Sequence, residues 1–231
     1  MDIMDSQHTD IITNSQQLIL KQIEDSALVV SNRKDLYFKK GDDPLSYADT
    51  LNYFYFIMSG KIKIYQIDLH SSKEQILYLL SYGDMFDVVS LLDKKPNEYL
   101  SEVLEDTHII QVPLRDVEAM ILDDARFRHY FYSYLAQQLK SMEELAVSLS
   151  FYDVYQRVLQ LFAKFTEVVE GKSQLKVIDN LSHEDLASMI GTVRKVLNRS
   201  LQRLKSDGII EISRKNIQIK NFQKLLEQLS V

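Results

Sequence analysis

Residues 181–205 read LSHEDLASMIGTVRKVLNRSLQRLK. The stretch contains two short helical patterns on either side of Gly191, which predicts a tight turn because a residue without a side chain tolerates positive φ. Two helices joined in this way form a helix-turn-helix, whose second helix enters the major groove of DNA in many nucleic-acid-binding proteins. The stretch therefore predicts a DNA-binding element.

Each helix of the pair has a start signal. Ser182 is expected to cap the first helix, with Asp185 as its acidic partner in the first turn. Thr192 is expected to cap the second helix. The apolar residues of that second helix fall on one face, which predicts that this face is buried; they are Val193, Val196, Leu197, Leu201 and Leu204.

Basic and amide side chains fall on the opposite face of the second helix. The candidates for reading bases are Arg194, Lys195, Asn198 and Arg199. In the major groove Arg and Lys pair with guanine, and Asn pairs with adenine. The candidates for contacting phosphates are Thr192, Ser200, Arg203 and Lys205, with Arg214 and Lys215 further along the chain. An isolated basic helix is usually a solvated face, but the cap and the glycine turn favour DNA binding here.

A hairpin is expected directly after the pair. Asp207-Gly208 predicts a turn, and Ile209–Ile212 and Ile217–Ile219 have the composition of strands. A hairpin in this place makes the module a winged helix. Asn221–Val231 has the pattern of a terminal helix.

The chain of 231 residues has a formal net charge of −6, unevenly distributed. From Lys176 onward ten Lys and Arg stand against six Asp and Glu, whereas the preceding residues hold seventeen against twenty-seven. A basic end on an acidic body indicates one nucleic-acid-binding module. Cysteine is absent, which excludes disulfides and cysteine-ligated zinc or iron–sulfur sites. Because no apolar run is long enough for a membrane span, we expect a cytoplasmic protein.

The N-terminal part predicts a leading helix followed by many short strands. The helical pattern lies before Asn32, and the strand-like texture extends from Asp35 to Pro113. The strand candidates are Phe54–Ile57, Lys61–Ile67, Gln75–Leu80 and His108–Val112. Short strands separated by turns indicate an antiparallel barrel or sandwich, so the fold class is α+β.

Helical periodicity returns after the strands. A short piece is expected at Leu114–Leu122, a long helix at about 124–150, and another helix at Phe151–Val169 that ends near Gly171. Steps of four and three along the long helix predict a coiled-coil dimer seam of Phe131, Leu135, Gln138, Met142, Leu145 and Leu149. The alternative is a helix packed only on its own domain. Gln138 either fixes the register of the seam or lies exposed at its edge.

The chain resembles the Crp/Fnr family of bacterial transcription regulators over nearly its whole length. The residues that carry the resemblance in the C-terminal part are Ile190-Gly191, Arg194, Arg199, Leu201, Leu204 and Asp207–Ile210, and in the N-terminal part Gly41, Tyr55–Ile64, Leu77 and Gly83-Asp84. The resemblance implies a jelly-roll-like sensory β-roll (1–123), a dimerisation helix (124–150) and a winged helix-turn-helix domain (151–231). It also implies a homodimer that binds a pseudo-palindromic site on double-stranded DNA, with RNA polymerase as a further partner.

Two departures from the family pattern concern ligand and target. Members that bind cAMP carry Gly-Glu and Arg-Ser where this chain has Asp87-Val88 and Glu98-Tyr99, and no arginine occurs between Arg33 and Arg115. An acidic pocket without arginine is a poor phosphate site, so we expect that cAMP does not bind in the usual mode. Lys195 stands where the family often has glutamate, which puts the family's best-known half-site in doubt because lysine cannot accept a hydrogen bond from cytosine.

Three modes of regulation are left open. An unidentified small ligand can be placed between the roll and the long helix, near Met85, Phe86, Tyr130, Tyr134 and Gln138. Haem is an alternative because the family includes haem-based nitric oxide and carbon monoxide sensors; the available histidines are His70, His108 and His129. The third mode is control by expression level alone.

Other classes of function have weaker support. A cupin-type metalloenzyme needs clustered histidine and glutamate ligands, whereas the strand region has only His70 and His108. No nucleophile elbow, P-loop or paired-histidine motif occurs, so we expect no catalytic or metal site. A nucleotide-responsive adaptor that does not bind DNA is the remaining alternative.

Overall fold

In the computed structural model the chain divides into two compact units, comprising Met1–Ile64 with Leu79–Lys140 and Tyr65–Tyr78 with Ser141–Val231. The structure describes residues 31–45, 49, 51–96, 98–169, 172–213 and 216–229. The predicted leading helix lies outside these residues except for Ser31 and Asn32, which are helical.

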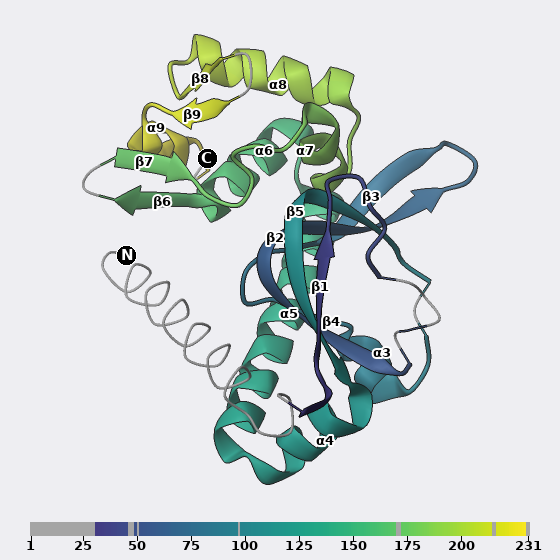
Figure 1. Cartoon of the computed structure of the whole chain (residues 1–231). Helices are drawn as coiled ribbons and strands as arrows, with labels where there is room; N and C mark the ends of the chain where they lie inside the picture. Colours follow the sequence, from purple (N-terminus) through teal and green to yellow (C-terminus); the bar gives the residue numbers. More distant parts are fainter. Residues whose placement is uncertain are drawn as a thin grey trace. The chain divides into compact units, whose positions relative to one another are not determined.

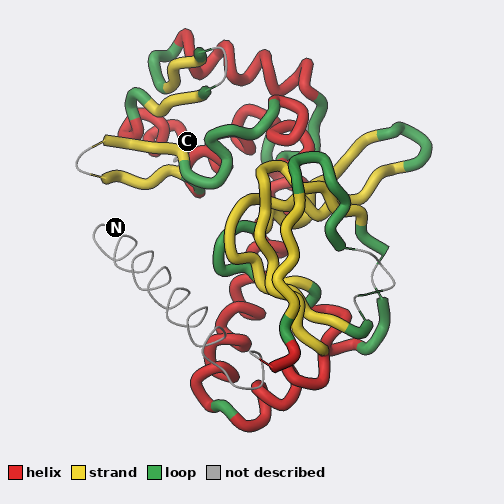
Figure 2. The backbone as a smooth tube through the Cα atoms, in the orientation of Figure 1, coloured by secondary structure: helices red, strands yellow, loops and turns green. Residues whose placement is uncertain are grey.

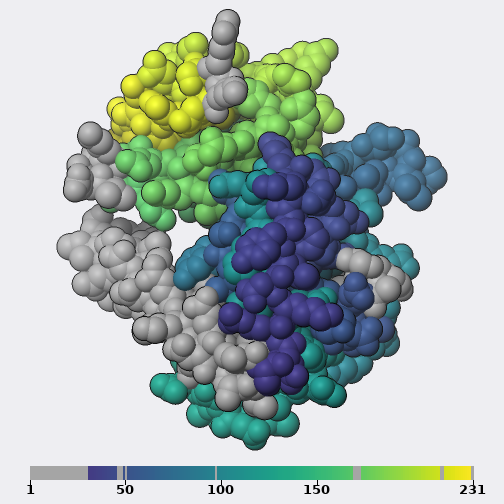
Figure 3. Space-filling view, viewed as in Figure 1, coloured from purple at the N-terminus to yellow at the C-terminus, as the bar shows by residue number. Residues whose placement is uncertain are grey.

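The first unit is built on an antiparallel sheet in the order β1-β5-β2-β3, with β4 paired to β2 (Figure 1). The strands are β1 (Lys34–Phe38), β2 (Tyr53–Asp68), β3 (Lys73–Leu80), β4 (Met85–Phe86) and β5 (Leu100–Pro113). Strand β1, purple in the space-filling view, lies on the surface of its unit (Figure 3). The predicted antiparallel roll is confirmed.

Strand β2 joins two predicted strands into one. Gly60 lies between them at φ +86°, and a Cβ there would come within 2.2 Å of the Thr107 hydroxyl oxygen on β5. Only glycine fits this close approach. In the part beyond Gly60, Lys63 is buried and forms a 2.9 Å ion pair with Glu102.

The core of the first unit lies between the sheet and its helices. These helices are α3 (Val88–Asp93), α4 (Leu114–Asp123) and the first half of α5 (Ala125–Phe151). Phe54 and Phe56 of β2 meet edge to face at 5.3 Å, and Phe127 and Phe131 of α5 pack in the same cluster. Each such side chain stabilises the fold by about 1.5 to 3 kcal/mol through removal from water.

Phe131 was predicted to face a dimer partner, and this is wrong. Its side chain is fully buried in the core of its own unit. By contrast Tyr132 and Leu139 are 54% and 61% exposed. The exposed apolar residues of α5 therefore begin at Tyr132 and not at Phe131. Steps of four and three fit a line that starts at either residue.

The second unit contains five helices or helical parts and two strand pairs among its described residues, and the strand pairs are yellow in Figure 2. Its elements are the end of α5, α6 (Val154–Lys164), β6 (Thr166–Val169), β7 (Lys172–Leu175), α7 (His183–Met189), α8 (Arg194–Ser206), β8 (Ile210–Ile212), β9 (Ile217–Ile219) and α9 (Phe222–Leu229). The tip of the β2–β3 hairpin also belongs to this unit.

The helix predicted at Phe151–Val169 ends earlier than expected. Helix α6 stops at Lys164, and Thr166–Val169 pairs antiparallel with Lys172–Leu175. Threonine and paired valines favour a strand because β-branched side chains pack well on a pleated surface. Leu159 and Phe162 of α6 are fully buried, like Leu225 of α9.

Candidate nucleic-acid interface

Helix α7 begins with the predicted cap. The Ser182 hydroxyl oxygen accepts from the Asp185 backbone N–H at 3.0 Å, and the same hydroxyl donates to the Asp185 carboxylate at 2.6 Å. The prediction of this start signal is confirmed. The reciprocal bonds fix where α7 begins, and with it the residues His183 and Glu184 of the first turn.

Side-chain contacts fix the backbone of the turn between α7 and α8. Gly191 has φ +65°, and a Cβ at this position would lie 2.5 Å from a methyl carbon of Leu149. Three consecutive carbonyl oxygens accept side-chain donors: Met189 from Gln75 at 3.4 Å, Ile190 from Arg157 at 2.6 Å and Gly191 from Lys73 at 2.8 Å. No local sequence pattern predicts these three donors, because they are distant from the turn in the chain.

Helix α8 buries one face and exposes its first turn. Leu197, Leu201 and Leu204 are fully or almost fully buried, as predicted. Val193 is not: it is the N-cap residue, is 52% exposed and provides no cap hydrogen bond. The prediction that Thr192 caps α8 is therefore wrong.

Helix α8 therefore begins without a side-chain cap, and we call this its open start. The first backbone N–H groups of a helix have no partner within it, and an aliphatic side chain cannot accept from them. Such a start attracts anions, phosphate above all.

The four predicted base readers lie near this open start, in two kinds of environment. The Arg194 guanidinium forms a 2.6 Å ion pair with Glu184, and the Asn198 amide oxygen lies 2.7 Å from Nδ1 of His183. Lys195 and Arg199 are exposed. Sequence reasoning missed both α7 partners, although a helix pair joined by so short a turn must bring their first turns together.

The residues predicted to contact phosphates differ in their exposure. Ser200 is buried, so the structure contradicts its assignment as a phosphate contact. Arg203 is exposed, but its guanidinium carbon lies 3.9 Å from the centre of the Tyr155 ring. Thr192 is half-buried and Lys205 exposed. Arg214 and Lys215 lie outside the described residues, between the paired strands β8 and β9.

The roll carries a carboxylate, Asp87, at the first position where the chain departs from the family pattern. Asp87 is buried and caps α3: its carboxylate accepts from the N–H groups of Val89 and Ser90 at 3.0 and 3.3 Å, and from the Ser90 hydroxyl at 2.5 Å. The pattern Asp-x-x-Ser is a capping signal that sequence reasoning overlooked. The start of α3 is thus occupied by the chain's own negative charge.

The residues predicted to line an effector pocket are brought together, but as packed core. Met85, Phe86, Tyr130 and Tyr134 are buried, and Gln138 is half-buried. Burial raises the pKa of both tyrosines, so their hydroxyls stay protonated. Tyr130 donates to the carbonyl of Gly83 at 3.1 Å and Tyr134 to that of Met85 at 3.1 Å. Their polar groups are therefore satisfied within the protein.

The three histidines considered as haem ligands have different surroundings. Nε2 of His108 lies 2.8 Å from the Asp35 carboxylate, and its ring stacks on Tyr37 at 4.5 Å. His70 lies in the β2–β3 turn and His129 is exposed on α5. The described residues contain no group of three or more His, Cys, Asp or Glu side chains suited to a metal ion.

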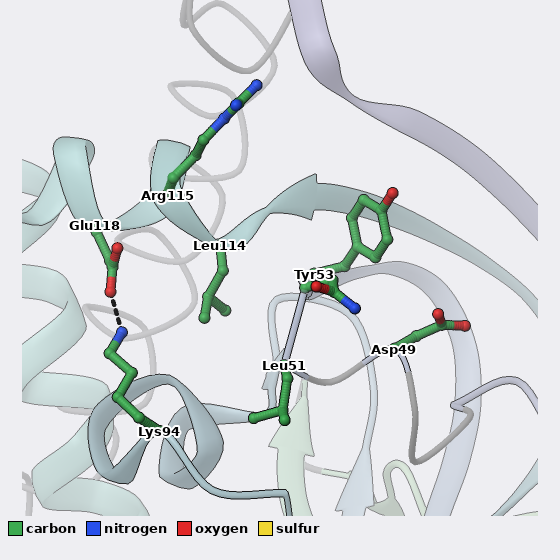
Figure 4. Close-up of a pocket in the computed structure, with 8 residues that line it drawn as sticks. Asp49, Leu51, Tyr53, Lys94, Leu114, Arg115 and Glu118 are labelled. Atoms are coloured by element: carbon green, nitrogen blue, oxygen red, sulfur yellow. Dashed lines mark hydrogen bonds and ion pairs between the residues drawn. The ribbon is translucent and has the colours of Figure 1, made fainter.

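An open pocket of about 820 Å³ lies elsewhere in the first unit (Figure 4). It is lined by Asp49, Leu51, Asn52, Tyr53, Lys94, Leu114, Arg115 and Glu118. Lys94 and Glu118 form an ion pair at one side of it. None of the predicted effector residues lines it.

Comparison with known proteins agrees with this arrangement. A cyclic nucleotide-binding domain model matches residues 35–124, and a Crp-like helix-turn-helix domain model matches residues 156–228. The chain belongs to the Crp/Fnr family of transcription regulators. As a Crp/Fnr regulator it is a DNA-binding protein, as the sequence predicted.

Among similar Crp/Fnr regulators is the cyclic AMP receptor protein of Thermus thermophilus, 26% identical over 81% of this chain and 84% of the relative. The CRP-like cAMP-activated global transcriptional regulator of Mycobacterium tuberculosis is 24% identical over 90% of this chain and 94% of the relative. A CooA mutant from Carboxydothermus hydrogenoformans has the same fold, with a TM-score of 0.74, 22% identity and coverage of 88% and 90%. No described helix is long and apolar enough to cross a membrane.

Proposed function

We propose that this Crp/Fnr regulator reads DNA through the outer face of α8, with Arg194, Lys195, Asn198 and Arg199 toward the bases. The observation that carries the proposal is the open start of α8: an exposed, uncapped N-cap residue directly before four basic or amide side chains. Phosphate suits the helix start, and the adjacent side chains suit base edges. Thr192 and Lys205 are the remaining described phosphate contacts in this proposal, with Arg203 held against Tyr155.

The regulator works as a homodimer in this proposal, with α5 as the shared helix. The partner-facing line begins one residue later than the sequence suggested, and its steps of three and four match a coiled coil; it consists of Tyr132, Leu135, Leu139, Met142, Ala146 and Leu149. Tyr132 and Leu139 of this line are more than half exposed. Two α8 helices then meet half-sites about one helical turn apart.

The effector of this regulator is not cAMP in the usual mode. A cyclic phosphate at the start of α3 would meet the Asp87 carboxylate, which already occupies the available N–H groups. The region also lacks any arginine to offset the repulsion. The domains are a sensory roll (1–123), a dimerisation helix (124–150) and a DNA-binding domain (151–231), and RNA polymerase is a further partner.

A selection from a random duplex pool tests the DNA-reading proposal. We expect recovery of a pseudo-palindrome by the full-length protein at low salt, and a mass in solution of two chains. Failure to retain any duplex at low salt would favour the adaptor that does not bind DNA.

Calorimetric titration with cAMP tests the effector proposal separately. We expect no heat of binding at micromolar ligand. Micromolar affinity would show that the Asp87 carboxylate does not prevent cAMP binding. It would place the regulator among the cAMP-responsive members of its family.

A further inference from the structure

The outer face of α8 is held in place by the first residue of α7. Nδ1 of His183 lies 2.7 Å from Oδ1 of Asn198, fifteen residues further on, and both side chains are half-buried. The Ser182–Asp185 cap fixes the position of His183, because His183 immediately follows the cap residue. The bond therefore joins two rigid helices.

The direction of this hydrogen bond follows from its atoms. An amide oxygen only accepts, so Nδ1 of His183 carries the hydrogen and donates it. Oδ1 of Asn198 is thereby turned toward His183, and its second lone pair can still accept from another donor. The hydrogen bond holds the amide in one orientation.

A held orientation matters because an amide can read different bases. Reading adenine in two-point fashion requires the amide oxygen to accept from the adenine amino group while the nitrogen donates to N7, whereas guanine offers two acceptors, O6 and N7. An amide that is free to turn over can suit either base. An amide that His183 holds presents one pattern of donors and acceptor.

We propose that His183 is a specificity-determining positioning residue, which holds the Asn198 amide in one orientation through Nδ1 and so sets the base preference at the position that Asn198 reads. The inference rests on the proposed reading of DNA by α8. It differs from a direct phosphate contact by His183, which would strengthen binding to all sequences alike.

Four variants of the full-length regulator test the proposal: His183→Ala, His183→Asn, Asn198→Ala and the double variant His183→Ala with Asn198→Ala. His183→Asn is the conservative replacement, since an asparagine amide nitrogen can occupy about the place of Nδ1. Gln202→Ala, exposed further along α8, is the matched control. Each protein is first checked for folding by circular dichroism and then used in the random-duplex selection.

The position that loses its preference in Asn198→Ala is then measured by competition with duplexes that carry each of the four bases there. We expect His183→Ala to reduce the preference for the selected base about tenfold, within the range for one base contact. His183→Asn should retain the preference. The double variant should match Asn198→Ala, because His183 acts only through Asn198.

Two results would overturn the proposal, and they differ. If Asn198→Ala relaxes one position while His183→Ala lowers affinity for every sequence equally and reduces the salt dependence, His183 contacts phosphate and only this inference fails. If the Arg194→Ala, Asn198→Ala and Arg199→Ala variants all keep the wild-type base preferences, the proposed reading by α8 fails with it.

Discussion

Helices α3 and α8 begin in opposite ways. The start of α3 is closed by the buried carboxylate of Asp87, whereas the start of α8 has the exposed Val193 and no side-chain acceptor. At both starts the first N–H groups have no partner within the helix and carry partial positive charge. An outside anion therefore has room at the start of α8, whereas the chain's own carboxylate occupies the start of α3.

The largest expected effect concerns Asp84, a second carboxylate near the start of α3. Asp84 accepts from the Ser81 backbone N–H at 2.8 Å and lies 3.3 Å from the Tyr134 hydroxyl oxygen, but burial raises its carboxyl pKa to about 6. Between about pH 4 and 6 the unfolded chain loses this proton while the folded chain keeps it. The free energy of unfolding should therefore fall by up to about 3 kcal/mol as pH rises through this window.

Urea denaturation of the wild type and Asp84→Asn at pH 4, 5, 6 and 7 measures this effect. The difference between the two proteins isolates Asp84 from other titrating groups. A difference that does not change with pH would mean that the carboxylate is as well solvated when folded as when unfolded.

The next effect concerns the open start. Arg199→Ala removes an exposed guanidinium from the proposed reading face, which should cost about 1 to 3 kcal/mol of binding free energy and relax specificity at one base position. Competition gel shifts with single-base variants of the selected site provide the measurement. An equal loss on all sequences would mean that Arg199 contacts only phosphate.

Asp87→Ala opens the closed start. It leaves two N–H groups and the Ser90 hydroxyl without their acceptor, so the free energy of unfolding should fall by about 1 to 2 kcal/mol. Asp87→Asn, which keeps an acceptor, should lose less. We expect neither variant to bind cAMP, since no arginine is gained; a calorimetric signal from Asp87→Ala would show that its carboxylate alone excludes the nucleotide.

The smallest effect comes from closing the open start. Val193→Asp gives α8 a capping carboxylate and should raise the free energy of unfolding by about 1 kcal/mol, while its charge lowers DNA affinity about tenfold at low salt. Val193→Ser provides a cap without charge and is the matched control. Unchanged DNA affinity in Val193→Asp would place the phosphates away from this helix start.

Much of the fold could be predicted from local patterns. The roll strands, the long helix, the Ser182 cap and the wing follow from periodicity and turn residues, which act over a few positions. The helix end at Lys164 was missed because Thr166–Val169 forms a strand only with a partner across the hairpin. Phe131 was misplaced because burial against a distant sheet decides which side of a helix is exposed.

The site was predicted less completely than the fold. The basic face of α8 follows from spacing alone, whereas the pairing of Asn198 with His183 and of Arg194 with Glu184 depends on how two helices cross. Val193 is exposed although its spacing places it among the apolar residues, because it stands before the first helical turn rather than within it.

The three anchored carbonyls of the turn at Met189, Ile190 and Gly191 bear on how this regulator can be re-engineered. Their donors, Gln75, Arg157 and Lys73, all lie outside residues 181–205. A chimera that receives only the helix pair would lack these three hydrogen-bond donors. The smallest portable module includes α6 and the tip of the β2–β3 hairpin, so the boundary of the DNA-binding part is discontinuous in sequence.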